Sequence, residues 1–463
     1  MTCRFDDVIA SVRVGALALG VLACSAAADE PDDPISGVGL ITLMPGVDIA
    51  DILADFPSLV SGVVDSIPSR QVYLLQIAQG VTEDQFELVI ETDPRILRAE
   101  LDFVSGDPGP GAQDFWIGSS LRQFESQTII VELGLGAAHS LSTGAGTVVA
   151  IVDTGLDAAH PGLSSATVLP GFNFVDGTTD TSDVGNGLDD DGDLLIDEMV
   201  GHGTFVAGLV NLVAPDAALL PVRVIEGDGH STAFLLAKGI YFAIDQGADV
   251  INISMGADVE VPVVEDAVDE AVDAGIIVVA SAGNDSREVP PLYPSAFNKV
   301  VATCAVDFGD VLAPFSNFGD HVVVSAPGVD LVSLIPGGGF GSASGTSFSA
   351  PLLSGTAALV KSIGSVRRWA HFKKMLKDTT IDVSTLNPAF DGLMGFGRLD
   401  VAAAASWNGC LADLDGDGAV DIGDFFTFVG AFAGGDLLAD VNDDDTVDVR
   451  DFFEFIVLYM QGC

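Results

Sequence analysis

The stretch Val149-Ala150-Ile151-Val152-Asp153-Thr154-Gly155 decides the fold class of this chain. Its continuous apolar, β-branched part, which begins at residue 147, is typical of a strand that is buried on both faces of a parallel sheet. Comparable runs occupy 220–225, 250–254, 276–280, 300–306 and 322–325, and apolar helical patterns between or after them occupy 232–245, 265–273 and 350–362. This alternation predicts an α/β fold of three layers, with a mainly parallel sheet, over residues 140–406.

Three glycine-flanked segments supply an acid, a base and a nucleophile in that chain order. Asp153 ends the first segment, His202 lies in Gly201-His202-Gly203-Thr204, and Ser347 lies in Gly345-Thr346-Ser347-Phe348-Ser349-Ala350-Pro351. A serine hydroxyl is a weak nucleophile until a base takes its proton, and an imidazole with an ordinary pKa of about 6.5 can do so at neutral pH. An aspartate then orients the imidazole and stabilises the imidazolium. Each segment alone is typical of a turn, a loop or a helix start, but together they predict a catalytic triad.

Residues 140–406 resemble the catalytic domain of the subtilase family of serine endopeptidases, whose triad has this order. The resemblance implies that Asn284 donates to the oxyanion hole beside the backbone N–H of Ser347, which we expect just before an apolar helix. It also implies that protein or peptide substrates bind as an extended strand between two backbone walls. These walls are Ser254, Met255 and Gly256 on one side, and Ala282 and Gly283 on the other. Phe205 stands where many members have a second histidine, outside the triad.

The first 28 residues predict an export signal. Arg4 and Arg13 flank a short apolar stretch over 14–23, and Ala26-Ala27-Ala28 offers a cleavage site. Cys24 leaves acylation as a lipoprotein open as an alternative anchor. We therefore expect a secreted or extracytoplasmic protein, and no later stretch is long and apolar enough to predict a membrane span.

Residues 29–108 predict a small α+β unit ahead of the catalytic region. The pattern over 72–77 predicts a strand, Thr82 to Gln85 a helix cap, and 96–103 a second strand. Segment 71–104 resembles the propeptides of subtilases, although a surface hairpin of the main domain is the alternative. Residues 109–139 then form a linker and the start of the catalytic region, with a maturation site between about 105 and 138.

Acidic residues dominate the charge of the chain. Asp and Glu number 67 against 18 Lys and Arg, for a formal net charge of −49. Nucleic acid is excluded as a partner, because phosphate binding requires the opposite sign. Acidity of this kind favours solubility, and the spaced clusters of Asp point to calcium.

The segment 408–463 contains a repeat in which Asp424-Phe425-Phe426 recurs as Asp451-Phe452-Phe453. Each copy follows a loop whose oxygen donors match the EF-hand spacing, with position 7 contributing a backbone carbonyl to Ca²⁺. The first loop offers Asp413, Asp415, Asp417, Ala419, Asp421 and Asp424; the second offers Asp440, Asn442, Asp444, Thr446, Asp448 and Asp451. Asp replaces the usual Glu at position 12, and Asp445 stands where glycine is usual.

This repeat resembles a type I dockerin, which implies a small all-α module held by calcium. We expect its two helices to pack through their aromatic residues, namely Phe425, Phe426, Phe428, Phe432, Phe452, Phe453, Phe455 and Tyr459. Loop positions 10 and 11 lack the Ser-Thr pairs of dockerins that bind cohesin, so a cohesin-like or cell-envelope partner stays an alternative. Cys410 and Cys463 bracket the module and predict a disulfide, whereas Cys304 in a strand-like run predicts a buried thiol.

A third acidic run, 186–198, precedes His202 and has two interpretations. Asp189, Asp191, Asp193 and Asp197 are spaced as in a calcium loop, and a solvated insertion is the alternative. Two other functions also stay open: a secreted binding protein on an inactive subtilase scaffold, and a structural calcium-binding envelope protein. The latter leaves the three catalytic segments unexplained.

Overall fold

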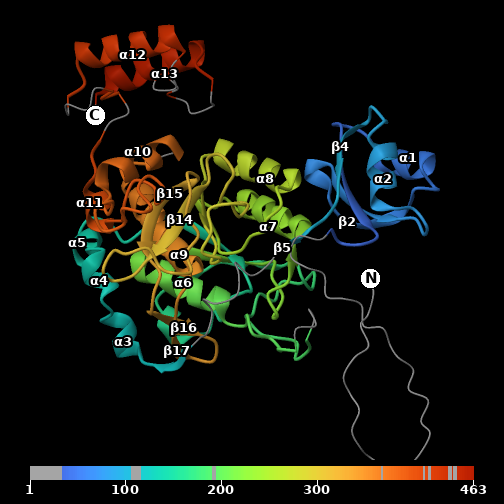
Figure 1. The fold of residues 1–463 in the computed structure, drawn as a ribbon, viewed down its shortest axis with the longest axis horizontal. Helices are drawn as coiled ribbons and strands as arrows, with labels where there is room; N and C mark the ends of the chain where they lie inside the picture. Colours follow the sequence, from blue (N-terminus) through green and yellow to red (C-terminus); the bar gives the residue numbers. More distant parts are fainter. Residues whose placement is uncertain are drawn as a thin grey trace, which may run out of the picture.

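The computed structural model describes residues 34–105, 116–189, 194–366, 369–409, 412–414, 419–435, 439, 441 and 446–462. The predicted signal with Cys24, the Cys410–Cys463 disulfide and part of the predicted maturation region lie outside these residues. Figure 1 shows three parts in chain order: an N-terminal unit, a large central domain and a C-terminal pair of helices.

An eight-stranded sheet forms the centre of the large domain, and all of its pairings are parallel. In sheet order its strands are β15 (Val322–Pro327), β14 (Val301–Val306), β13 (Ile277–Ser281), β12 (Val250–Ile253), β7 (Val148–Asp153), β10 (Ala218–Arg223) and β8 (Thr167–Val168), with β9 (Phe172–Asn173) also paired to β10. Nearly every residue of the six longest strands is buried, which is why they are continuously apolar. The predicted α/β fold is confirmed.

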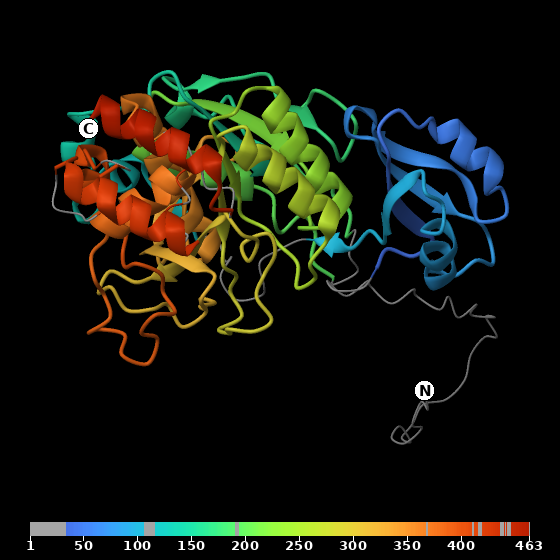
Figure 2. The same cartoon turned by 90° about the horizontal axis from the view of Figure 1, so that it is seen from above.

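Two helices cover each face of this sheet. Helices α6 (His202–Val213) and α9 (Thr346–Ile363) contact each other on one face, and α7 (Ala233–Asp245) and α8 (Pro262–Asp273) do so on the other (Figure 2). The chain passes from β7 to β10 on one side and then to β12 on the other. Ligands bind at such a reversal of strand order, outside the carboxyl ends of the strands.

Helix α9 begins at Thr346, earlier than predicted, so Ser347 lies within its first turn rather than before it. The prediction was misled by Pro351, which lies inside the helix and has no N–H to donate to the carbonyl of Ser347. The Ser254 hydroxyl donates to that carbonyl instead, at 2.9 Å. A side chain from another element therefore compensates for the missing helix bond.

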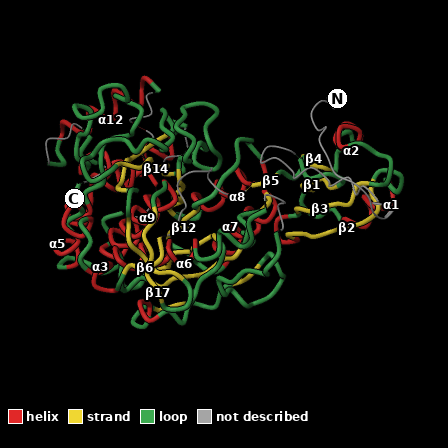
Figure 3. Tube along the Cα trace, turned by 60° about the horizontal axis from the view of Figure 1, so that its bottom comes forward, coloured by secondary structure: helices red, strands yellow, loops and turns green. Residues whose placement is uncertain are grey.

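The N-terminal unit has its own antiparallel sheet, in the order β2 (Val60–Ile67), β3 (Val72–Ile77), β1 (Val38–Leu43) and β4 (Ile96–Glu100). Helices α1 (Ile49–Asp55) and α2 (Glu83–Ile90) accompany it, and Thr82 and Gln85 form the predicted capping box of α2. The unit has a hydrophobic core of its own, which includes Phe86, whereas its residues Leu40, Ile67 and Val72 pack with the core of the large domain. Figure 3 shows the strands of this unit apart from those of the central sheet. A surface hairpin of the main domain would have no such core.

Helices α12 (Ile422–Gly434) and α13 (Val449–Gln461) form the C-terminal pair, and the rings of Phe428 and Phe455 stack between them at 4.1 Å. The expectation that all the aromatic residues pack inward was wrong for Phe426 and Phe453, which are 66% and 64% exposed. Both lie about 100° around the helix from the preceding phenylalanine, outside the contact face. Of the helices in the described part of the chain, none combines the length and hydrophobicity that a bilayer crossing requires.

The remaining elements connect these parts. They are η1 (Pro68–Arg70), β5 (Val104–Ser105), β6 (Trp116–Ser119), α3 (Leu121–Glu125), α4 (Ile129–Glu132), α5 (Leu135–His139), η2 (Pro161–Leu163), β11 (Ser231–Thr232), β16 (Leu331–Ile335), β17 (Gly339–Ala343), α10 (Trp369–Thr379) and α11 (Val401–Ser406).

Candidate active site

The predicted acid and base meet at the carboxyl end of the central strand. Asp153 is the last residue of β7 and His202 the first of α6, and both side chains are fully buried. Nδ1 of His202 lies 2.7 Å from Oδ1 of Asp153. Because a carboxylate only accepts, this contact places the proton on Nδ1 and makes Nε2 the basic nitrogen.

Glycine permits this close approach of α6 to the end of β7. A Cβ atom on Gly203 would lie 2.2 Å from the carbonyl oxygen of Gly155 and 3.2 Å from Cβ of Asp153. Gly155 itself has a φ of +120°, which side chains rarely tolerate. The glycines of both sequence segments are therefore requirements of the geometry around the Asp–His pair.

The predicted nucleophile lies at the start of α9, which packs directly on α6. The ring of Phe348 lies 5.4 Å from that of His202 and 4.5 Å from that of Phe205. The buried Phe205 side chain therefore packs where α6 meets α9. Ser347 Oγ is fully buried and donates to the carbonyl oxygen of Ser254 across 3.4 Å. The fold thus brings the base and the hydroxyl-bearing helix turn to the same buried site.

Asn284 lies beside this helix start, oriented by two bonds. Its Oδ1 accepts from the backbone N–H and the hydroxyl of Thr346, at 2.9 and 3.0 Å. Its Nδ2 is buried and has no hydrogen-bond partner among the described residues. An unsatisfied buried donor costs about 1–3 kcal/mol, so an amide held in this way fits a donor reserved for a ligand oxygen next to Ser347.

The two predicted substrate walls follow neighbouring strands. Ser254, Met255 and Gly256 continue β12, and Ala282 and Gly283 continue β13, which pairs with β12 in parallel. The side chains of Ser254, Met255 and Ala282 are all buried. Any contact of these residues with an extended peptide would therefore use backbone groups, as the prediction requires.

The described parts of the C-terminal loops hold two buried carboxylates in matching positions. Asp424 Oδ1 accepts from the N–H of Leu414, and Asp451 Oδ1 accepts from that of Val441, at 2.7 and 2.9 Å. Each also completes a capping box with the aspartate three residues before it. Both carboxylates are directed into their own loops, and such hard oxygen donors suit Ca²⁺.

The other predicted ligands divide into two sets. Asp413, Ala419, Asp421, Thr446 and Asp448 belong to the described residues, whereas Asp415, Asp417, Asp440, Asn442 and Asp444 lie outside them. In the described ranges, no cluster of three or more His, Cys, Asp or Glu side chains has a metal-binding arrangement. The calcium loops stay a prediction.

The acidic run before His202 is described only at its two ends, because Asp191 and Asp193 lie outside the described residues. Asp197 accepts from the N–H groups of Asn186 and Gly187 at 2.9 and 2.8 Å. Asp189 accepts from the N–H of Leu194 at 3.2 Å. These bonds close a turn whichever interpretation holds, so calcium binding here also stays a prediction.

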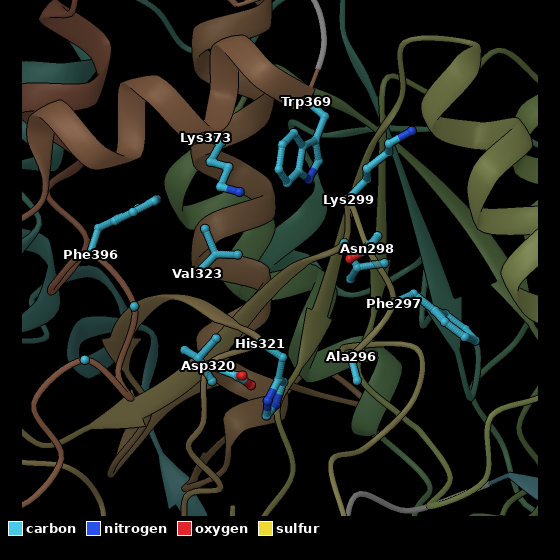
Figure 4. Close-up of a pocket in the computed structure, with 14 residues that line it drawn as sticks. Ala296, Phe297, Asn298, Lys299, Asp320, His321, Val323, Trp369, Lys373 and Phe396 are labelled. Atoms are coloured by element: carbon cyan, nitrogen blue, oxygen red, sulfur yellow. The ribbon is translucent and has the colours of Figure 1, made fainter. Parts of the chain in front are cut away.

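A cavity of about 650 Å³ has none of the predicted active-site residues in its wall. Figure 4 shows the residues that line it. Lys299, His321, Trp369 and Lys373 line it, together with residues at the starts of β14 and β15. The triad is predicted at the carboxyl ends of the parallel strands, so this cavity lies at the opposite edge of the sheet. None of the predicted site residues lines it.

The sequence profile of the subtilase family matches residues 144–397. The chain belongs to the subtilase family. Members of this family are subtilisin-like serine endopeptidases, and the chain is therefore one of them. The matched range contains all four residues predicted to act in catalysis.

Curated relatives agree with this assignment. The chain is 35% identical to thermitase of Thermoactinomyces vulgaris over 57% of its own length and 90% of the relative's. It is also 35% identical to a thermophilic serine proteinase of Bacillus sp. strain AK1, over 57% of this chain and 62% of that protein. The match with this second relative thus spans less than two thirds of it.

A solved structure supports the fold. Fervidolysin from Fervidobacterium pennivorans, a keratinolytic enzyme related to subtilisin, superposes with a TM-score of 0.64 at 24% sequence identity. The superposition covers 81% of this chain and 61% of fervidolysin. It therefore extends beyond the range that the family profile matches.

Proposed function

We propose that this subtilase is a secreted serine endopeptidase in which Asp153, His202 and Ser347 are the catalytic triad. The observation that carries the proposal is the buried 2.7 Å contact between Asp153 and His202, formed where α9 presents Ser347. Asn284 Nδ2 and the Ser347 N–H are the oxyanion donors. The presence of all three proposed triad residues and of Asn284 disfavours the alternative of a calcium-binding protein on an inactive scaffold.

The reaction proceeds in two displacements. Ser347 Oγ attacks the peptide carbonyl carbon while His202 Nε2 takes the hydroxyl proton, and the oxyanion donors stabilise the tetrahedral intermediate. The C–N bond then breaks as His202 gives this proton to the departing amine, leaving an ester on Ser347. Water, deprotonated by His202, attacks the ester carbonyl, and the proton returns to Ser347 Oγ as the acid product leaves.

The N-terminal unit is proposed as the propeptide, and its contacts with α7 and α8 support this role. Asp102 Oδ1 accepts from the N–H of Phe234 at 2.9 Å, and Glu100 Oε2 accepts from that of Val263 at 3.3 Å. Both carboxylates thus meet the positive end of a helix. Burial raises the pKa of Asp102 to about 6 and also raises the pKa of Glu100.

Ion pairs surround these caps. Arg70 pairs with Asp245 and Glu270 at 2.8 and 2.6 Å, and Arg98 pairs with Asp266. Strand β5 then pairs with β11 of the central domain, with Val104 opposite Thr232 and Ser105 opposite Ser231. The unit would thereby template α7 and α8 and hold its own C-terminal end on the central domain until cleavage.

The C-terminal module is proposed to bind Ca²⁺ through its two loops. The fully buried Asp424 and Asp451, held identically in both copies, support this proposal. Calcium would neutralise the clustered carboxylates and fix the start of each helix. A cohesin-like or envelope partner is a second proposal, for which the exposed Phe426 and Phe453 offer an apolar surface.

Labelling with a fluorophosphonate probe tests the proposed activity, because only an activated serine reacts. We expect the secreted protein to incorporate one equivalent and to hydrolyse casein. Ser347→Ala should abolish both, whereas the control Ser406→Ala, which removes an exposed serine hydroxyl, should change neither. Full casein hydrolysis by Ser347→Ala would overturn the assignment.

A further inference from the structure

We propose that Asp183, which lies outside the triad and outside all three catalytic segments, is the positioning residue that holds Asp153 and His202 in their mutual geometry. The proposal rests on the proposed function for its kinetic consequences. Its structural basis is the set of bonds that the Asp183 carboxylate accepts from the residues next to the predicted acid and on both sides of the predicted base.

Asp183 accepts four hydrogen bonds while being 1% exposed. Oδ1 accepts from the hydroxyl of Thr154 at 3.0 Å and from the N–H of Gly201 at 2.9 Å. Oδ2 accepts from the N–H and the hydroxyl of Thr204 at 3.0 and 2.6 Å. Thr154 directly follows Asp153, and Gly201 and Thr204 enclose the His202 position, so one carboxylate links both partners of the pair.

Helix α6 depends on this carboxylate because its own cap residue has no side chain. Gly201 occupies the N-cap with a φ of 102°, and no side-chain cap bond comes from it. The bond from Thr204 N–H to Asp183 is the one that an N-cap side chain ordinarily accepts from the third helical residue. Asp183 therefore caps α6 although it lies 18 residues before Gly201 in the chain. The helix dipole favours a negative charge at this end of the helix.

Two further bonds extend the network around the base. The N–H of Gly203 donates to the Thr154 hydroxyl at 2.9 Å, and the N–H of Asp157 donates to the Thr204 hydroxyl at 3.0 Å. Each threonine hydroxyl thus accepts one hydrogen bond from the backbone and donates one to Asp183. Loss of the carboxylate would free the end of β7 and the first turn of α6 at once.

The bonding pattern requires a carboxylate rather than an amide. All four partners are donors, and an ionised carboxylate has two accepting oxygens, whereas an amide has one. Asparagine would direct its NH₂ group against one backbone N–H, that of Gly201 or Thr204, which can only donate, and would force the neighbouring threonine hydroxyl to turn away from its present bond. The titratable groups that face this network are Asp153, Asp157 and His202, and burial, followed by the charge of Asp153, raises the pKa of Asp183.

Asp183 is remote from Gly201 in sequence and contacts it only because the chain folds back. Residues 184–200, which include the acidic run, separate it from Gly201. The carboxylate binds the chain at the point where this segment returns to the site. The loop can therefore vary without moving His202, as long as Asp183 holds both ends.

The test compares Asp183→Asn with Asp216→Asn, a control with the same charge change at an exposed carboxylate beyond the other end of α6. We expect Asp183→Asn to lower kcat on a peptide substrate by about 10²-fold with little change in KM, the cost of misplacing catalytic groups by an ångström. The acid limb of kcat/KM should move to lower pH, because a buried negative charge that favours the imidazolium is lost. Asp216→Asn should match wild type in both.

A second pair of variants covers the case in which Asp183→Asn does not fold. Thr204→Val keeps the shape of the side chain but removes one donor to the Asp183 carboxylate and one acceptor for the Asp157 N–H. This variant should lower kcat. Thr204→Ser retains the hydroxyl and should restore most of the activity. Wild-type kcat and an unchanged pH profile in Asp183→Asn, or equal kcat in Thr204→Val and Thr204→Ser, would overturn the proposal.

A spectroscopic measurement separates this proposal from the proposed function. In Ser347→Ala protein, the His202 Nδ1 proton bonded to Asp153 should give a downfield ¹H signal that Asp183→Asn shifts or broadens and Asp216→Asn does not. If wild type neither labels with fluorophosphonate nor hydrolyses peptides, the proposed function fails while this signal still reports the positioning. An unaltered signal in Asp183→Asn refutes the positioning itself.

Discussion

Replacing Ser254 by alanine should destabilise the central domain by removing one hydroxyl that serves two buried partners. This hydroxyl donates to the carbonyl oxygen of Ser347 at 2.9 Å and accepts from Asn252 Nδ2 at 3.0 Å. Pro351 cannot serve that carbonyl, because it has no N–H. Ser254→Ala therefore leaves one buried acceptor and one buried donor unsatisfied, each at about 1–3 kcal/mol, for a total of about 2–6 kcal/mol.

Urea unfolding in the Ser347→Ala background, which prevents self-digestion, measures this loss. Ser406→Ala is the matched control, because its hydroxyl also donates to a helix carbonyl, at 3.0 Å, but is exposed. We expect the control to cost less than about 0.5 kcal/mol, as surface substitutions usually do.

A double-mutant cycle with Pro351→Ala tests the physical reason. Alanine at this position supplies the missing N–H to the Ser347 carbonyl, so Ser254→Ala should cost about 1 kcal/mol less beside Pro351→Ala than alone. A cost below about 1 kcal/mol for Ser254→Ala, or additive costs in the cycle, would refute the account of how α9 tolerates its proline.

Four further predictions concern separate parts of the chain. Asn284→Ala should lower kcat by about 10²–10³-fold with a small change in KM, a magnitude that comes from subtilisin, a member of the same family; equal kcat would remove Asn284 from the oxyanion hole. The pKa of Asp102 is raised to about 6 in the folded protein, so protonation of this carboxyl favours the folded state. In urea titrations, Ser347→Ala protein should therefore gain stability relative to the same protein with Asp102→Asn as the pH falls from about 7 toward 5. A stability difference that does not depend on pH would contradict this. Millimolar CaCl₂ should raise the melting temperature of the C-terminal module in calorimetry of the whole chain, and Asp424→Asn with Asp451→Asn should abolish the increase; an equal increase in the double variant would exclude these loops. Cys304 is fully buried and its thiol pKa is raised to about 12, so native protein should not alkylate there at about pH 8, whereas urea-unfolded protein should, as peptide mass mapping would show.

The six longest strands of the central sheet were predictable because they are buried on both faces and are therefore apolar along nearly their whole length. The two-residue strands β8 and β9 carry no such pattern. The half-exposed β2 of the N-terminal unit alternates irregularly, with a burial pattern interrupted by two register shifts, and its sequence predicted no strand. The start of α9 was misplaced because a proline ordinarily excludes a helix interior. Only the hydroxyl of Ser254, which is remote in sequence, makes that proline tolerable.

The candidate site divides in the same way. Asp153, His202, Ser347 and Asn284 could be named as candidates from sequence because their segments occur together and in the chain order of the subtilase family, although each segment alone is typical of ordinary turns and helix starts. Asp183 carries no such signal, since an aspartate between serine and valine in a long acidic stretch is typical of a solvated loop. Its role depends on four donors from two separate elements, and no local pattern contains them.

The sequence by itself determined the α/β class, the order of acid, base and nucleophile, and the glycines that their approach requires, because these depend on local burial and backbone freedom. Tertiary structure decided which carboxylate caps α6, which hydroxyl replaces the helix bond lost at Pro351, and which donor near Ser347 stays unsatisfied. Those features are hydrogen bonds between elements far apart in the chain. Their partners are selected by the packing of the sheet and its helices, which no single segment encodes.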